Sequence, residues 1–311
     1  MPNPIDLHTH TNWSDGADSP AELVANARAA GITVLGLTDH DTLDGLAETA
    51  REAAAAGIEF WPGVEISTSM PLESGYRLPV HLLGYGIDPG HPELRATLAG
   101  YALARVLRIG QMLEKVNRLI FERDGSVEAV SPRRVLEIAG AGSVGRPHLA
   151  AAIVEAGYAG DISDAFDTFI GHGKPAYVRR APVDTEESIR LIRRAGGVPV
   201  LAHPVEYEPR DDAASPKVGL PLDELFARLV AAGLLGTEVD YGDYDDATRE
   251  RLRAAAARHG LIATGGSDYH GLPVKPDRPL GCAPVPFAAV EQLRAASELA
   301  RATADDPAWQ A

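Results

Sequence analysis

Two histidines and an aspartate lie close together near the N-terminus, in the stretch IDLHTHTNWSDG from Ile5 to Gly16. Imidazole and carboxylate groups together suit Zn, Mn or Fe, and carboxylates can bridge adjacent ions. In a strand, side chains alternate between faces, so His8 and His10 would share one face and could chelate one ion. The HxH motif alone is equally compatible with two structural histidines. Whether it belongs to a metal site therefore depends on residues elsewhere in the chain.

Further candidate ligands stand beside short apolar runs along the chain. Each lies at or near the C-terminal end of such a run, apart from His81, which stands near the start of HLLGYG. These residues are His40, Glu65, His81, His203, Asp268 and His270. In α/β barrels the active site is built from several strand ends at the C-terminal face. The pattern therefore predicts one metal site assembled from distant segments.

Alternating strand and helix patterns would position these residues. Strands are expected over 5–10, 33–40, 59–67, 80–86, 197–204, 235–241 and 259–271, and helices over 19–31, 43–57, 185–196, 222–233, 245–260 and 287–303. Ser19, Pro20 and Glu22 form a helix-start signal. Such alternation favours a parallel sheet or a barrel.

The middle of the chain differs, because 91–125 and 131–142 have helical patterns and strand signals are few. We therefore expect a barrel formed by 1–87 and 176–311, with a helical insertion over 88–175 that contributes to the substrate pocket.

The composition and charge of the chain limit the kinds of ligand and the cellular setting that are expected. The chain has 311 residues, one cysteine (Cys282) and a net charge of −15. Apolar runs are too short and broken for a membrane span, and no signal peptide is evident, so a cytoplasmic setting is expected. A strongly acidic surface disfavours long nucleic acid. Bound divalent ions would make one pocket positive, which suits a small phosphorylated ligand. The oligomeric state is not indicated.

The motifs DLHTHTNWSDG, LTDHD, GVEIS, HLLGYGI, AHP and GSDYHG, in this order and spacing, resemble the PHP (polymerase and histidinol phosphatase) superfamily. The resemblance spans about residue 5 to about residue 271. The insertion, with GRPHLA at 145–150 and GHGKPAYV at 171–178, is similar to that of small PHP phosphoesterases acting on nucleotides.

The resemblance implies a distorted (β/α)7 barrel, an α/β fold, that holds two or three divalent ions (Mn, Fe or Zn). By motif position, a first ion would be bound by His8, His10, Glu65 and Asp268. A second, bridged by Glu65, would be completed by His81 and His203. A third would be bound by Asp15, His40 and His270.

The expected chemistry is hydrolysis of a phosphoester by a metal-activated hydroxide, with Glu65, His203 and His270 as the catalytic residues. The resemblance favours the 3′-phosphate of a nucleoside 3′,5′-bisphosphate such as pAp, and also short oligonucleotides trimmed 5′ to 3′. Candidate substrate-binding residues are Arg105, Arg108, Arg146, His148 and Lys174. Two alternatives stay open: hydrolysis of histidinol phosphate or a cyclic phosphate, and a non-catalytic metal-binding PHP module.

Overall fold

The computed structural model describes residues 4–140, 142–179, 181–209, 219–272, 274–306 and 309. Within these residues the chain forms two compact units, one of residues 1–96 and 182–311 and one of residues 97–181. The expected boundaries lay at 87/88 and 175/176, several residues earlier. No described helix combines the length and apolar character that crossing a bilayer needs.

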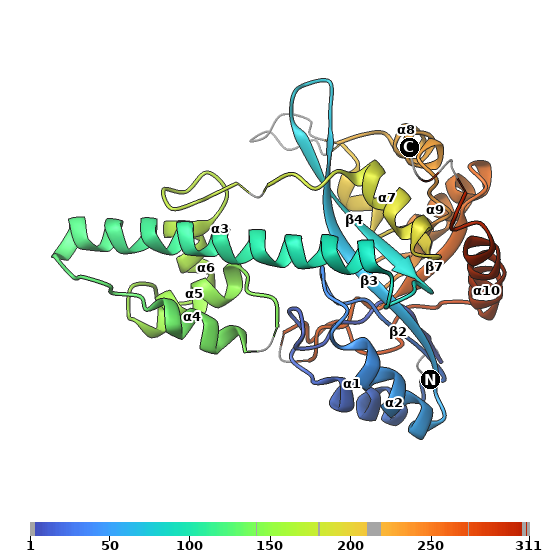
Figure 1. The fold of residues 1–311 in the computed structure, drawn as a ribbon, viewed down its shortest axis with the longest axis horizontal. Helices are drawn as coiled ribbons and strands as arrows, with labels where there is room; N and C mark the ends of the chain where they lie inside the picture. The colour runs from blue at the N-terminus through green and yellow to red at the C-terminus, as the bar shows by residue number, and fades with distance from the viewer. Residues whose placement is uncertain are drawn as a thin grey trace. The chain divides into compact units, whose positions relative to one another are not determined.

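The first unit is built on one sheet, whose described strands follow each other in chain order (Figure 1). They are β1 (Ile5–Asp6), β2 (Val34–Leu37), β3 (Glu59–Pro71), β4 (Arg77–Tyr85), β5 (Val198–Leu201), β6 (Gly236–Tyr241) and β7 (Ile262–Gly266). All residues of β2, β5 and β6 are buried, as expected for strands covered on both faces. A parallel bridge between Thr9 and Tyr269 joins the last segment to the first. The predicted (β/α)7 barrel is thus confirmed.

One strand runs against the others. β4 is antiparallel to both β3 and β5, while the remaining pairs are parallel. The sequence did not indicate this reversal, which arises because β3 and β4 are joined by a hairpin with no crossover helix between them.

Helices of the first unit pack on the outside of these strands. They are α1 (Pro20–Ala29), α2 (Leu46–Ala56), α7 (Thr185–Arg194), α8 (Leu222–Ala231), α9 (Asp246–Arg258) and α10 (Phe287–Ala302), with a short 3-10 helix over Pro204–Tyr207. The helix-start signal is confirmed, since Ser19 and Glu22 form a capping box at α1. Val290 and Leu293 of α10 share a buried cluster with Ile5, Val34 and Val198, at the strand starts. This helix therefore closes the end of the barrel opposite the strand carboxyl ends.

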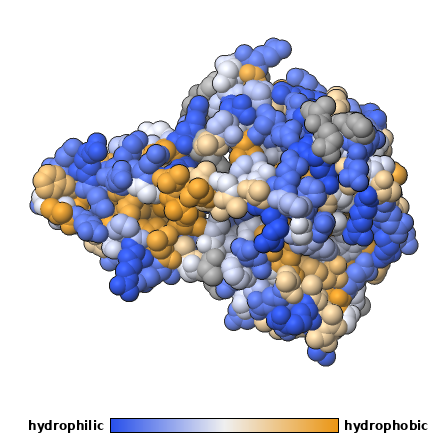
Figure 2. Space-filling view, viewed as in Figure 1, coloured by the Kyte–Doolittle hydropathy of each residue, from blue (hydrophilic) through white to orange (hydrophobic). Residues whose placement is uncertain are grey.

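The second unit is helical and has a core of its own. α3 (Pro92–Asp124) supplies most of its residues to this unit, followed by α4 (Pro132–Ala139), α5 (Arg146–Glu155), α6 (Ile162–Ala165) and a π-helical turn over Phe166–Ile170. Its core includes Met112, Val116, Leu149 and Ile170. Hydrophobic side chains are also exposed on its surface (Figure 2), among them Leu103 and Leu107 of α3.

Candidate metal centre

The nine candidate ligands come from segments at one end of the barrel. His8 and His10 follow β1, Asp15 lies in the next loop, His40 follows β2, Glu65 is in β3, His81 is in β4, His203 follows β5, and Asp268 and His270 follow β7. Two backbone bridges hold these segments together, Thr9 with Tyr269 and His40 with Glu65.

The reversal of β4 explains the unusual place of His81 in its strand. His81 pairs with Ser67 of β3, two residues beyond Glu65. Because the strands are antiparallel, the start of β4 lies beside the later part of β3. The imidazole Nδ1 of His81 is 2.8 Å from Glu65 Oε1. A ligand near the start of an antiparallel strand thus reaches the same site as ligands at the ends of parallel strands.

The first group of ligands is His8, His10, Glu65 and Asp268, all of them buried. The Nε2 atoms of His8 and His10 are 3.1 Å apart. They lie 3.1 and 3.2 Å from Glu65 Oε2 and 3.5 and 3.2 Å from Asp268 Oδ1. These are the four residues predicted to bind the first ion.

Glu65 divides its two carboxylate oxygens between two sets of histidines. Oε2 faces His8 and His10, and it lies 3.3 Å from His40 Nδ1. Oε1 is 2.8 Å from His81 Nδ1 and 3.3 Å from His203 Nε2. A carboxylate presented in this way can bridge two ions. His40, Glu65 and His81 form a compact ligand group, and His203 adjoins it through Glu65.

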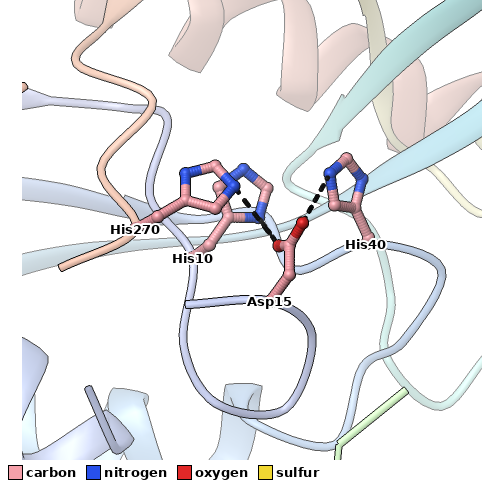
Figure 3. Close-up of side chains that lie close together, drawn as sticks. All are labelled: His10, Asp15, His40 and His270. Atoms are coloured by element: carbon pink, nitrogen blue, oxygen red, sulfur yellow. Dashed lines mark ion pairs between the residues drawn. The ribbon is translucent and has the colours of Figure 1, made fainter. Parts of the chain in front are cut away.

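The third group contains His10 in addition to the predicted Asp15, His40 and His270. Asp15 lies between His270 and His40 (Figure 3), with distances of 3.3 Å to His270 Nε2 and 3.7 Å to His40 Nε2. His270 Nδ1 donates to the backbone oxygen of Asp268 at 2.8 Å. This hydrogen bond places the proton on Nδ1 and leaves Nε2 as the nitrogen facing Asp15.

Electrostatics at the site are set by buried charges facing one another. Burial opposes the charge of His10, but hydrogen bonds to Asp268 and Glu65 outweigh it and raise its pKa to about 9. Burial lowers the pKa of His40 to about 4 despite the nearby carboxylates. Burial alone would raise the pKa of Glu65, but the charges of His40, His8 and His81 hold it well below its usual range. Glu65 is therefore an anion that requires a positive partner.

The donor set fits divalent metal ions. Ligand atoms about 2.1 Å from one ion lie about 3.0 to 3.4 Å from one another, which matches the spacing of the first group. Among the described residues, Nδ1 of His10 and Nδ1 of His40 are buried without a hydrogen-bond partner. Two imidazole Nε2 atoms at 3.1 Å share at most one proton, whereas a cation would satisfy both.

Hydrogen bonds that support the ligands were not predicted from the sequence, and they involve two carboxylates. Glu238, fully buried in β6, accepts from His8 Nδ1 at 3.0 Å and from the His203 backbone N–H at 2.9 Å. Asp268 Oδ2, the oxygen turned away from the histidine pair, accepts from Tyr241 and Lys275, each at 2.8 Å. An acidic residue inside an apolar strand such as GTEVDY was the available signal for Glu238.

The five predicted substrate-binding residues all lie in the second unit, and several make contacts inside it. Arg108 Nε donates to the backbone oxygen of Val178 at 2.7 Å. Arg146 stacks over the Phe166 ring at 5.3 Å. His148 Nδ1 accepts from the Gly145 backbone at the start of α5. Arg105 is half-buried on α3, and Lys174 is half-buried in the loop after the π-helical turn. Their role towards substrate stays a prediction.

Comparison with known proteins places this geometry in context. The family model described as PHP domain matches residues 6–107. The chain is 35% identical to a 3′,5′-nucleoside bisphosphate phosphatase of Chromobacterium violaceum, covering 86% of this chain and 87% of that protein. It is 33% identical to a 5′-3′ exoribonuclease of Haemophilus influenzae, over 87% of this chain and 91% of that one. A solved structure from Bifidobacterium adolescentis, whose assignment as a metal-dependent phosphoesterase is itself inferred, is similar with a TM-score of 0.77, 31% identity and coverage of 95% and 98%.

Proposed function

The chain belongs to the PHP family of metal-dependent phosphoesterases, and on that premise we propose that it removes the 3′-phosphate of a nucleoside 3′,5′-bisphosphate such as pAp, leaving AMP. The observation that carries the chemistry is Glu65, one buried carboxylate whose two oxygens face two separate sets of histidines. The substrate is taken from the similarity to the bisphosphate phosphatase over most of both chains.

We propose the ligands of up to three ions from their motif positions, and the short distances to Glu65 support this proposal. His8, His10, Glu65 and Asp268 would hold the first ion, Glu65, His81 and His203 the second, and Asp15, His40 and His270 the third. Divalent ions would lower the pKa of a coordinated water towards neutrality and would neutralise phosphoryl oxygens. Mn, Fe and Zn all suit this donor set.

His203 and His270 differ in what their second ring nitrogen contacts. Nδ1 of His270 is committed to the Asp268 carbonyl, so this residue serves as a ligand. Nδ1 of His203 is 3.2 Å from Glu206, whose side chain is 52% exposed, and 3.2 Å from the Tyr207 hydroxyl. A proton released at His203 therefore has a path to solvent through Glu206. With Nε2 directed at the second ion, His203 can exchange a proton only through Nδ1, so we assign assistance in proton transfer to His203 in addition to its role as a ligand, and to His270 the role of ligand alone.

Within the first unit, a pocket beside His81 and His203 could hold the rest of the substrate. A pocket of about 310 Å³ is lined by Tyr76, Leu78, Pro79, His81, His203, Glu206 and Tyr207. It lies in the lower part of the size range of small-molecule sites. Tyr207 exposes little of its surface to this pocket, and its hydroxyl accepts from the His81 backbone N–H at 2.9 Å.

The test is phosphate release from pAp with Mn²⁺, run beside AMP, histidinol phosphate and a cyclic nucleotide. We expect release from pAp, accumulation of AMP and little release from the other esters. Turnover of histidinol phosphate or the cyclic ester with pAp untouched would overturn the substrate and retain the metal chemistry. Absence of turnover on every ester by metal-loaded protein would instead support the non-catalytic module.

A second activity is favoured by the similarity to the exoribonuclease, namely removal of single nucleotides from the 5′ end of very short RNA. The net charge of −15 opposes binding of a long polyanion. In the same assay, a 5′-phosphorylated dinucleotide should be cleaved and a long RNA should not. Equal cleavage of both lengths would contradict the role we give to the acidic surface.

A further inference from the structure

We propose that a β-bulge in β6 aims Glu238 at two metal ligands at once, and that Glu238 is the positioning residue that orients both His8 and His203. The inference rests on the metal site of the proposed function. It assigns a role to a residue that is itself outside every ligand group.

The bulge is visible in the pairing of β6 with β7. Glu238 pairs with Thr264, but Asp240 pairs with Gly265, so β6 has one residue more than its partner between these two pairs. In a regular strand, residues 238 and 240 would point to the same face. The extra residue resets the alternation, and bulges of this kind re-aim side chains next to active sites.

The two carboxylates consequently serve opposite sides of the strand. Glu238 contacts His8 and His203 inside the barrel. Asp240 makes contacts of 2.6 and 2.8 Å with Arg253 of α9, outside the barrel. Gly265 is needed for this geometry, because a Cβ there would lie 2.0 Å from the Asp240 backbone oxygen.

Each contact of Glu238 fixes one ligand. By accepting from His8 Nδ1, the carboxylate selects the tautomer whose Nε2 faces Glu65 and Asp268. By accepting from the His203 backbone N–H, it supports a residue held at φ 30°. That left-handed backbone is uncommon for a residue with a side chain and requires such support. It turns the imidazole of His203 towards Glu65 Oε1.

The test compares Glu238→Gln with Asp240→Asn. Glutamine retains one acceptor oxygen but places an NH₂ group against either the His8 ring N–H or the His203 backbone N–H. Asp240→Asn is a matched control, since Asp240 is an equally buried carboxylate of the same strand that contacts no ligand. Affinity for Mn²⁺ and Zn²⁺ would be measured by competition with a chelator, and melting of the metal-free proteins by circular dichroism.

We expect Glu238→Gln to bind metal about 10- to 100-fold more weakly, the usual cost of losing such a support, while Asp240→Asn keeps wild-type affinity. A merely structural role would lower the melting temperature of the metal-free protein without this difference in affinity. Unchanged metal affinity in Glu238→Gln, or equal losses of metal affinity in both variants, would overturn the role given to Glu238 but not the proposed function. Wild-type protein that binds no metal would overturn the proposed function as well.

A second measurement uses the wild-type protein and therefore does not require a substituted protein to fold. In zinc-loaded wild-type protein, nitrogen-15 NMR should show a proton on Nδ1 of His8 and zinc on Nε2. Zinc on Nδ1 would contradict the contact with Glu238.

Discussion

Glu65 shows how much a single side chain contributes to this site. It is 1% exposed, carries a charge and contacts five histidines. A charge buried to this degree is costly unless it is paired. Because these five histidines come from four segments of the chain, the same carboxylate links those segments at the site.

Glu65→Gln should therefore abolish turnover. The amide is neutral and has only one acceptor oxygen, so both the bridge between ions and the charge are lost. We expect kcat for phosphate release from pAp to fall more than about 100-fold, beyond the effect typical of a residue that only supports a ligand. Metal content should fall in parallel, as measured by elemental analysis. Glu206→Gln, a half-exposed carboxylate nearby, is the comparison for metal content, and a fully active Glu65→Gln enzyme would contradict this assignment.

Cys282 gives a prediction about pH. Burial, together with the nearby charge of Asp6, raises the pKa of the Cys282 thiol to about 11. An unfolded cysteine has a pKa of about 8.5, so at pH 8.5 about half of the unfolded thiol is thiolate but well under about 1% of the folded thiol is. Alkylation by iodoacetamide at pH 8.5 should be slow in the native protein and fast in urea. Equal rates would show that the thiol is not protected by the fold.

At the scale of elements, the existence of the strands and the ligands at their ends were predictable, and the direction of β4 was not. Apolar runs along the chain were enough to predict seven strands and the placement of ligands at strand ends, while the distorted (β/α)7 barrel was implied by the resemblance to the PHP superfamily. The direction of β4 has no periodic signature, since an antiparallel strand alternates as a parallel one does. The role of Glu238 was missed for a related reason. A bulge depends on pairing with another strand, here β7, and the sequence of β6 alone does not show it. His8, which hydrogen-bonds to Glu238, is 230 residues away in the sequence.

The close approach of β7 to His8 leads to an element-scale prediction. A Cβ on Gly266 would lie 2.5 Å from both the backbone nitrogen and the Cβ of His8. Gly266→Ala should push the two segments apart, destabilise the fold by about 1–3 kcal/mol and weaken metal binding. Urea unfolding and chelator competition would measure both effects.

Gly110 of α3 provides the control for this substitution. A Cβ there meets nothing within 4 Å, so Gly110→Ala should be neutral or stabilising by about 0.5–1 kcal/mol. Wild-type stability and metal affinity in Gly266→Ala would mean that the segments are less tightly packed than described.

For the whole molecule, the core and the metal ligands are separate. The buried cluster that includes Ile5, Val34, Leu293 and their neighbours contains none of the nine ligands. We therefore expect chelation to stop phosphate release while far-ultraviolet circular dichroism is retained. Adding Mn²⁺ to 100 times its Kd should restore activity and stabilise the fold by about 2.7 kcal/mol for each site. Activity that survives complete chelation would contradict metal dependence.

The second unit is predicted to contribute binding rather than chemistry. Lys174→Gln and Arg146→Gln should raise KM for pAp about tenfold and leave kcat close to wild type. A contact that is equally strong in the bound substrate and in the transition state affects binding but not the rate of the chemical step. Lys115→Gln, an exposed lysine of the same unit that donates to the Tyr177 backbone oxygen at 3.2 Å, is the control. A fall in kcat with unchanged KM would give these residues a different role.

The bridge between Thr9 and Tyr269 joins parts of the chain that are synthesised at very different times. His8 and Asp268 are 260 residues apart. At about 5–20 residues per second, about 13 to 52 s pass between their synthesis. For most of that interval the emerging chain contains His8, His10 and Glu65 of the first ligand group but lacks Asp268. The proposed first ion would therefore acquire its fourth ligand only after residue 268 has been synthesised and the barrel has closed.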